Sequence, residues 1–160
     1  MNITSEDFYL NQPMDPKSGW DLFKEKKVIV FGLPGAFTPT CSSKQLPGFE
    51  AMYDQFIEEK EIDEIYCVSV NDGFVMRAWA KEQTSGYKVK CIADGNGEFT
   101  RRMGMLVDKT NLGFGMRSWR YAAVINNGIV IEMLAEKGIE DNHEDDPYEV
   151  STPENVYERL

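Results

Sequence analysis

Residues 27–41, KVIVFGLPGAFTPTC, decide the fold. Residues 28–33 form a continuous apolar run between a lysine pair and Pro34. Apolarity that is continuous rather than alternating is typical of a central strand buried on both faces. The turn that follows contains Pro34-Gly35 and Thr38-Pro39, and a helical pattern begins after it. We therefore predict that Cys41 lies in the first turn of a helix.

Beyond Cys41 the sequence alternates between helix and strand patterns. Apolar residues at three- and four-residue steps predict a helix through residues 46–57, whose start is kinked or interrupted by Pro47-Gly48. Strands are expected at 65–70 and 89–93, with a helix from Asn71 or Asp72 through Lys81 between them and a short helix at 96–102. Residues 108–116 are expected to be rich in loops.

The two ends of the sequence complete the plan. Residues 1 to about 24 indicate an irregular lead-in that ends in a short helix near residues 20–25. Residues 121–126 and 129–134 flank Asn127-Gly128, a strong hairpin signal. An acidic loop, EDNHEDD at 140–146, precedes a terminal helix at 153–160. This order predicts the α/β class, with a thioredoxin-like three-layer fold, a central mixed β-sheet flanked by helices, in a single domain over residues 1–160.

Composition narrows the function classes. A formal net charge of −10 argues against a nucleic-acid or anionic-membrane partner, because both would repel the chain. No stretch reaches the roughly 18 to 20 apolar residues of a membrane span, and the first ten residues lack a secretory signal pattern. We expect a cytoplasmic location; residence in an organelle after removal of a targeting peptide stays open.

The three cysteines, Cys41, Cys67 and Cys91, are an odd number without a CxxC pair. This pattern does not fit a secreted disulfide framework or a thioredoxin-style dithiol. Three scattered cysteines and the single His143 lack the spacing of a structural zinc site, so we expect no metal and no cofactor. The pattern favours a reducing compartment with at least one reactive thiol.

Cys41 has two interpretations. A thiol in the first turn of a helix meets unpaired backbone N–H groups and the positive end of the helix dipole, and both favour the nucleophilic thiolate. A helix terminus alone supplies only about 0.3–1 kcal/mol at an exposed site, so a nearby arginine is expected as well. The alternative is that Cys41 is a small buried residue, as most free cysteines are.

The segments around and after Cys41 resemble a known family. The string PGAFTPTC at 34–41, followed by SSKQLPGFE, is similar to the active-site loop of the peroxiredoxins, most closely the type-II, or peroxiredoxin-5-like, subfamily of the thioredoxin-like superfamily. DEIYCVSVNDGFVMRAWAK, IADGNGEFTRRMGM and LGFGMRSWRYAAVINNGIV resemble later segments of that subfamily. The likeness covers roughly residues 20 to 135 and implies a thiol peroxidase.

The resemblance also implies the roles of individual residues. Cys41 is the peroxidatic nucleophile that attacks a hydroperoxide, such as hydrogen peroxide or an alkyl hydroperoxide, and becomes a sulfenic acid. Thr38 hydrogen-bonds the thiolate and the peroxide, and Pro34 shields the sulfur from water. Arg120 supplies the guanidinium beside the sulfur, and the backbone N–H groups of Thr40 and Cys41 hold the peroxide oxygen.

A second arginine, Arg117, competes with Arg120 for this place. If residues 119–125 are a strand, the two arginines lie three apart and face opposite sides. The match to the family favours Arg120. For either residue the alternative is a solvated surface arginine.

How the sulfenic acid of Cys41 is reduced depends on the other cysteines of this chain. Cys67 and Cys91 are expected to be buried structural thiols, and the acidic loop contains His143, expected to be a solvated loop histidine, where some relatives have a resolving cysteine. We therefore expect a 1-Cys cycle in which glutathione with glutaredoxin, or thioredoxin, reduces Cys41.

Two further expectations concern the oligomeric state and whether the protein is an enzyme. A homodimer is expected, with the candidate contacts Phe37, Phe74, Phe114 and Trp119. The alternative to the enzyme is a non-enzymatic thiol redox sensor on the same fold. A disulfide oxidoreductase is disfavoured by the missing CxxC motif.

Overall fold

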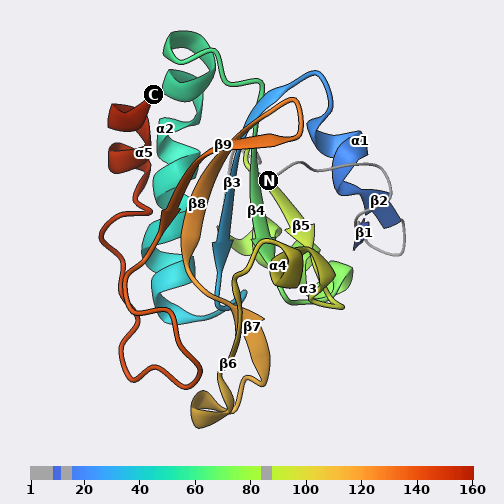
Figure 1. The fold of residues 1–160 in the computed structure, drawn as a ribbon, viewed down its shortest axis with the longest axis vertical. Helices are drawn as coiled ribbons and strands as arrows, with labels where there is room; N and C mark the ends of the chain where they lie inside the picture. The colour runs from blue at the N-terminus through green and yellow to red at the C-terminus, as the bar shows by residue number, and fades with distance from the viewer. Residues whose placement is uncertain (1–8, 12–15, 84–87) are drawn as a thin grey trace.

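The computed structural model describes residues 9–11, 16–83 and 88–160. Within these residues a mixed sheet in the order β2-β1-β5-β4-β3-β8-β9 forms the centre, with helices on both faces (Figure 1). Its strands are β1 (Tyr9–Asn11), β2 (Pro16–Ser18), β3 (Lys27–Leu33), β4 (Glu64–Ser69), β5 (Lys90–Ala93), β8 (Tyr121–Asn126) and β9 (Ile129–Ala135). The predicted α/β class and thioredoxin-like plan are confirmed.

Strand β3 is the central strand that its apolar run predicted. It pairs in parallel with β4 and antiparallel with β8, so both of its edges are hydrogen-bonded. Ile29 and Phe31 contribute to the core on one face, and Val28 and Val30 to the core on the other. Burial on both faces explains why its apolarity does not alternate.

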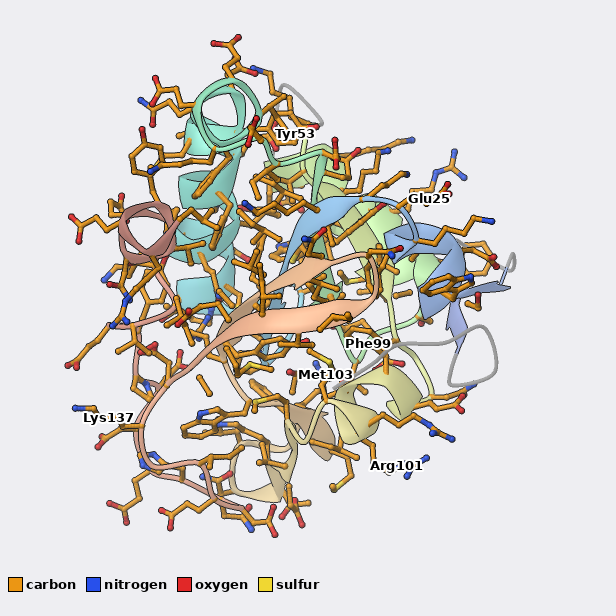
Figure 2. The ribbon with its side chains drawn as sticks, turned by 45° about the horizontal axis from the view of Figure 1, so that its top comes forward. Glu25, Tyr53, Phe99, Arg101, Met103 and Lys137 are labelled. Atoms are coloured by element: carbon orange, nitrogen blue, oxygen red, sulfur yellow. The ribbon has the colours of Figure 1, made fainter. Side chains whose placement is uncertain are left out.

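The helices divide between the two faces. Residues of α2 (Leu46–Glu59), α3 (Gly73–Gln83) and α5 (Pro153–Arg159) belong to the first core. Residues of α1 (Gly19–Phe23) and α4 (Glu98–Arg102), and Met103 just after α4, belong to the second. Figure 2 labels Phe99 and Met103, two of the residues that α4 and its C-terminus contribute to that second core.

The hairpin of β8 and β9 is confirmed, and its turn has the geometry that its sequence demands. Asn127 and Gly128 have φ values of 48° and 78°. Two consecutive positive φ angles are characteristic of the tight hairpin turn that asparagine and glycine tolerate best.

Two loop predictions need correction. The lead-in is not wholly irregular, because β1 and β2 pair antiparallel at one edge of the sheet; the rest of that prediction, at residues 1–8 and 12–15, lies outside the described residues. The prediction for residues 108–116 is incomplete, because this loop-rich segment is bounded by two strands that were not predicted. A separate two-stranded sheet, β6 (Leu106–Asp108) and β7 (Met116–Ser118), encloses a 3₁₀ turn, η2 (Thr110–Leu112), and projects below the main sheet in Figure 1.

The irregularity expected at Pro47-Gly48 is found in the residues just before it. Residues 46–59 form the helix α2, with Pro47 in its first turn. The distortion precedes it, in a π-helical turn, η1 (Cys41–Gln45). Across the part of the chain that the structure describes, no helix combines the length and apolarity needed to cross a membrane.

Candidate active site

Cys41 is the first residue of the π-helical turn η1, at the end of the sheet where β3 ends. The chain leaves β3 at Leu33, turns over five residues and is helical from Pro39. The amide of Leu46 donates to the Cys41 carbonyl, five residues back, which defines the π turn. Such turns are rare and occur frequently at functional sites. The Cys41 side chain is almost completely buried, with 1% exposure.

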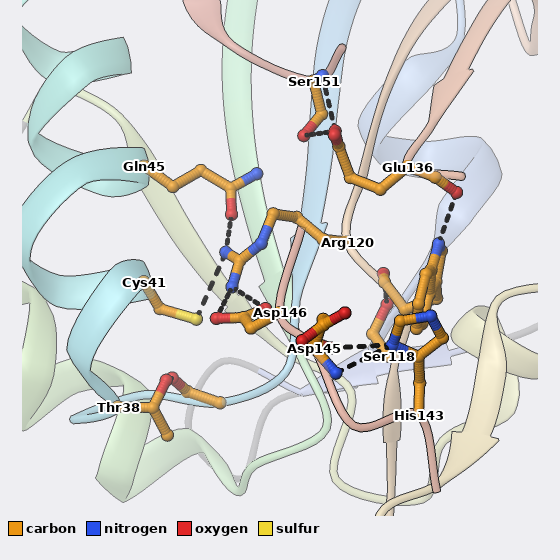
Figure 3. Close-up of polar contacts among 12 residues, drawn as sticks. Thr38, Cys41, Gln45, Ser118, Arg120, Glu136, His143, Asp145, Asp146 and Ser151 are labelled. Atoms are coloured by element: carbon orange, nitrogen blue, oxygen red, sulfur yellow. Dashed lines mark hydrogen bonds and ion pairs between the residues drawn. The ribbon is translucent and has the colours of Figure 1, made fainter. Parts of the chain in front are cut away.

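Arg120 reaches Cys41 from the connection between β7 and β8. Because Tyr121 pairs with Gly32 near the end of β3, Arg120 lies at the same end of the sheet as the Cys41 turn. Its Nη1 lies 3.5 Å from the Cys41 Sγ and also donates a short hydrogen bond to Gln45 Oε1 (Figure 3). The arginine is 1% exposed, so the sulfur and the guanidinium meet in a site closed to bulk water.

The other end of the guanidinium is held by the acidic loop. Nη2 of Arg120 donates to both carboxylate oxygens of Asp146, at 2.6 and 2.7 Å (Figure 3). The Tyr148 ring stacks against the same group, with its centroid 5.6 Å from Cζ. Burial lowers the pKa of Arg120, but the charges of Cys41 and Asp146 outweigh that effect and raise it overall. Arg120 therefore remains a cation beside the sulfur.

Thr38 and Pro34 line a pocket that does not include Cys41 itself but shares Asp146, the carboxylate bound to Arg120. The pocket has a volume of about 270 Å³ and is lined by Pro34, Thr38, Pro39, Lys109, Leu112, Phe114, Glu144, Asp145 and Asp146. The Thr38 hydroxyl donates to the Gly35 carbonyl at 2.6 Å, so its proton is used to hold the loop rather than given to the sulfur. Its oxygen retains lone pairs that can accept a hydrogen bond.

Arg117 holds the loop before Cys41. Its Nη1 donates to the Pro34 carbonyl and its Nε to the Phe114 carbonyl, both at 3.2 Å. A Cβ atom at Gly35 would collide with this guanidinium, so glycine leaves room for it. The sulfur thus contacts Arg120 and not Arg117. The expected alternation along one strand does not apply, because β7 ends at Ser118 and β8 begins only at Tyr121.

Cys67 and Cys91 lie in the sheet and belong to the same hydrophobic core as Cys41, while the hydrogen bond to the Cys41 sulfur comes from Arg120. They are register partners on the neighbouring strands β4 and β5. Cys67 is fully buried, and burial first and its contact with Cys91 second raise the pKa of its thiol well above the usual value. This is the environment of an unreactive core thiol. Cys91 is only partly buried, at the margin of the same core.

Two residues of the C-terminal half differ from expectation. His143 is not a freely solvated loop residue, because its ring packs edge-on against Trp119, 5.3 Å between centroids, and Nδ1 accepts a hydrogen bond from the Asp145 amide. Trp119, an expected dimer contact, is 1% exposed and its indole N–H donates to the Glu136 carbonyl. A side chain buried within its own chain offers no surface to a partner.

Sequence reasoning missed three residues around Arg120: Gln45, Asp146 and Tyr148. A signal existed for Gln45, which is a polar residue four positions after Cys41 and therefore on the same side of the turn. Asp146 gave no signal, because one aspartate in a run of acids is indistinguishable from its neighbours until the path of the loop is known.

Comparisons with known proteins identify the family of the chain. The family described as Redoxin matches residues 9–150. A peroxiredoxin of Rhizobium etli is 59% identical over 91% of this chain and 80% of its own length. The crystal structure of the Plasmodium falciparum antioxidant protein, a 1-Cys peroxiredoxin, is 47% identical, with a TM-score of 0.88 over 91% of this chain and 81% of that one.

A third relative has been solved in complex with hydrogen peroxide. The reduced Prx3 of Vibrio vulnificus in complex with hydrogen peroxide is 38% identical, with a TM-score of 0.88 over 100% of this chain and 97% of that one. The resemblance carried by the PGAFTPTC segment is therefore confirmed. The chain belongs to the redoxin family and, within it, to the peroxiredoxins, which are peroxidases that act through a thiol.

Proposed function

We propose that Cys41 is the peroxidatic nucleophile and reduces hydrogen peroxide and alkyl hydroperoxides to water and alcohols. The observation that carries this proposal is the 3.5 Å contact between Arg120 Nη1 and Cys41 Sγ in a site where both side chains are 1% exposed. A buried cation stabilises the thiolate, and the thiolate is the nucleophile. The chain would act as a single thioredoxin-like domain.

The chemical step follows from this arrangement. The Cys41 thiolate attacks one peroxide oxygen, the O–O bond breaks, and the departing oxygen takes a proton and leaves as water or an alcohol. Cys41 is left as a sulfenic acid, oxidised by two electrons. Negative charge moves from sulfur to the departing oxygen, and Arg120 with the backbone N–H groups of Thr40 and Cys41 would stabilise it there.

Thr38 and Pro34 would bind the substrate rather than activate the sulfur. Because the Thr38 hydroxyl donates its hydrogen bond to the Gly35 carbonyl, its oxygen can accept a hydrogen bond from the O–H of a hydroperoxide. Pro34 lines the pocket with an apolar ring and offers no backbone N–H there. Thr38 would thereby orient the O–O bond toward the sulfur, and Pro34 would limit the access of water.

The cycle would close with an external thiol. The only cysteines of the chain are Cys41, Cys67 and Cys91, so the segment after β9 supplies no resolving thiol. The raised pKa of the buried Cys67 makes it a poor nucleophile toward a sulfenic acid. Glutathione with glutaredoxin, or thioredoxin, would condense with the sulfenic acid, release water and then free Cys41 by thiol exchange. The 1-Cys relative from Plasmodium falciparum supports this proposal.

Assembly and location complete the proposal. Phe37 and Phe74 are 51% and 60% exposed, which is unusual for large apolar side chains and supports a homodimer. Phe114 is partly buried against Arg117 and is a weaker candidate. A cytoplasmic location is proposed because the proposed cycle requires a supply of reduced thiols.

Steady-state turnover tests the proposal and separates it from a redox sensor. Hydrogen peroxide is supplied in excess with either glutathione and glutaredoxin or thioredoxin and its reductase. We expect many turnovers with at least one of them, loss of turnover in Cys41→Ser and retention in the Cys67→Ser/Cys91→Ser double variant. If peroxide consumption stops at one equivalent per protein chain with both thiol donors, the protein is a redox sensor. Loss of turnover in the double variant, with its fold intact, contradicts the 1-Cys cycle.

A further inference from the structure

Asp146 links the acidic C-terminal loop to the reactive cysteine through a single cation. Both of its carboxylate oxygens bind Nη2 of Arg120, while Nη1 of the same guanidinium contacts the Cys41 sulfur. Arg120 is 1% exposed and the Asp146 side chain 44% exposed. The ion pair therefore spans from the buried sulfur to the surface of the pocket.

This arrangement places two anions on one cation. When Cys41 is a thiolate, its charge and that of Asp146 share the guanidinium of Arg120. A carboxylate fixed on one arm of the guanidinium holds the other arm toward the sulfur. The same carboxylate reduces the positive potential that the thiolate experiences. Asp146 thus orients Arg120 and at the same time weakens its effect on Cys41.

The surroundings of Asp146 are predominantly acidic. The pocket is lined by three carboxylates, those of Glu144, Asp145 and Asp146, against one ammonium group, that of Lys109. Lys109 is itself 2% exposed, and burial lowers the pKa of its side chain, opposed by the charges of Asp146 and Cys41. The charged and titratable groups near Asp146 and Arg120 include Lys109, Tyr148, Glu144 and Asp145. Arg117 and Cys67 also interact electrostatically with Cys41. An anionic substrate would be repelled by the three carboxylates of the pocket.

We propose that Asp146 is a positioning and specificity-determining residue of the Cys41 site, which holds Arg120 in place and makes the pocket select neutral over carboxylate-bearing hydroperoxides. The inference rests on the proposed function for its substrate, but its electrostatic part concerns the thiol alone. The selectivity arises because a negative carboxylate at the pocket repels an anion and leaves a neutral molecule unaffected.

Alkylation tests the electrostatic part without a peroxide. Iodoacetamide and iodoacetate attack the same thiolate and differ by one negative charge. The rates at Cys41 are measured by peptide mass spectrometry in the wild type, in Asp146→Asn and in Glu149→Gln. The last variant removes a charge from an exposed residue three positions away that is not part of the pocket lining.

The expected result has two parts. In Asp146→Asn the preference for iodoacetamide over iodoacetate falls about three- to tenfold relative to the wild type, and the acid limb of the iodoacetamide rate profile moves to lower pH. Glu149→Gln changes neither quantity comparably. Asp146→Asn keeps a side-chain oxygen that can accept a hydrogen bond from Arg120 Nη2, so Arg120 is expected to stay in place while the negative charge is lost. The direction of the pH change then separates the proposal from damage to the fold, because a misplaced Arg120 would move the acid limb to higher pH. An unchanged preference, or an acid limb that stays or moves upward, overturns the proposal.

Turnover then tests the substrate class. The probes are a short tertiary alkyl hydroperoxide that ends in a carboxylate and its methyl ester, which differ in charge at nearly constant size. We expect the wild type to favour the ester and Asp146→Asn to lose about three- to tenfold of that preference in kcat/KM. Equal preference in the two proteins refutes the specificity role. Consumption of neither probe, nor of hydrogen peroxide, by the wild type instead refutes the peroxidase function, while the alkylation result still decides the role of Asp146.

Discussion

The sulfur of Cys41 and the guanidinium of Arg120 meet at 3.5 Å although 79 residues separate them in the sequence. The pairing of β3 with β8 brings them together, because the turn after β3 and the turn before β8 lie at the same end of the sheet. Gln45 and Asp146 then fix the guanidinium from two sides. The reactive geometry is thus a direct consequence of the central strand pairing.

Replacing Arg120 should impair the reaction far more than replacing Arg117. Arg120→Lys keeps a positive charge but loses the planar fork that contacts Cys41 and Asp146 together. We expect kcat/KM for hydrogen peroxide to fall by about 10²–10³-fold, the usual effect of removing a donor aimed at developing charge. Stopped-flow measurement of peroxide consumption gives the value.

Arg117→Lys is the matched control, since Arg117 binds the Pro34 and Phe114 carbonyls rather than the sulfur. The decrease in kcat/KM for hydrogen peroxide should be much smaller in Arg117→Lys than in Arg120→Lys. Equal losses in the two variants would show that the sulfur contact of Arg120 has no special role.

Lys109 should make stability depend on pH in the alkaline range. Burial lowers the pKa of its side chain from 10.5, so the unfolded chain binds a proton more readily than the folded chain. Stability then rises with pH from the folded-state pKa up to about 10.5. The free energy of unfolding of the wild type should therefore increase relative to that of Lys109→Met as the pH is raised through this range.

Urea unfolding of both proteins at several pH values measures this difference. A difference that is constant with pH, or that changes in favour of Lys109→Met, would contradict the assigned direction of the pKa shift. Exposed Lys137→Met serves as the control and should show no such trend.

Glu136 should be a stability residue rather than a site residue. It is 3% exposed, and its carboxylate accepts hydrogen bonds from the Ser151 amide and hydroxyl (Figure 3). It also accepts from the amides of Glu149 and Val150. Glu136→Ala leaves these buried donors without their partner, which should lower the free energy of unfolding by about 2–4 kcal/mol. Urea denaturation provides the measurement.

The control for this change is Glu140→Ala, whose side chain is 65% exposed and should cost less than about 0.5 kcal/mol. A comparable loss in both variants would mean that the Glu136 network contributes nothing beyond surface charge.

Cys67 should be protected from alkylation in the folded protein. Its thiol is fully buried and its pKa is raised, so little thiolate forms at neutral pH and reagents do not reach it. Iodoacetamide at about pH 7.5 should modify Cys41 in the native protein and modify Cys67 only after denaturation. Rapid native labelling of Cys67 would refute its assignment as an unreactive core thiol.

The sequence predicted the fold well where local patterns and tertiary contacts agree. The continuous apolarity of residues 28–33 located the central strand, and Asn127-Gly128 located the hairpin. The strands β1, β2, β6 and β7 were missed because each has only three residues, too few to show a period of two. Their pairing partners, not their own sequences, make them strands.

Only the residues of the site that stand in recognisable sequence motifs were predictable. Cys41 and Arg120 stand in motifs that resemble a family, and the structure brings them together. Asp146 and the packing of His143 on Trp119 depend on how the acidic loop folds back over the sheet edge. No local pattern encodes that path, so only the three-dimensional structure reveals them.

The most direct test of the account identifies the atom that peroxide oxidises. The reduced protein is treated with one molar equivalent of hydrogen peroxide in the presence of dimedone, which captures sulfenic acids, and its peptides are mapped by mass spectrometry. We expect a near-stoichiometric dimedone adduct on Cys41, none on Cys67 or Cys91, and no adduct in Cys41→Ser. An adduct chiefly on Cys67 or Cys91, or peroxide consumption undiminished in Cys41→Ser, would contradict it.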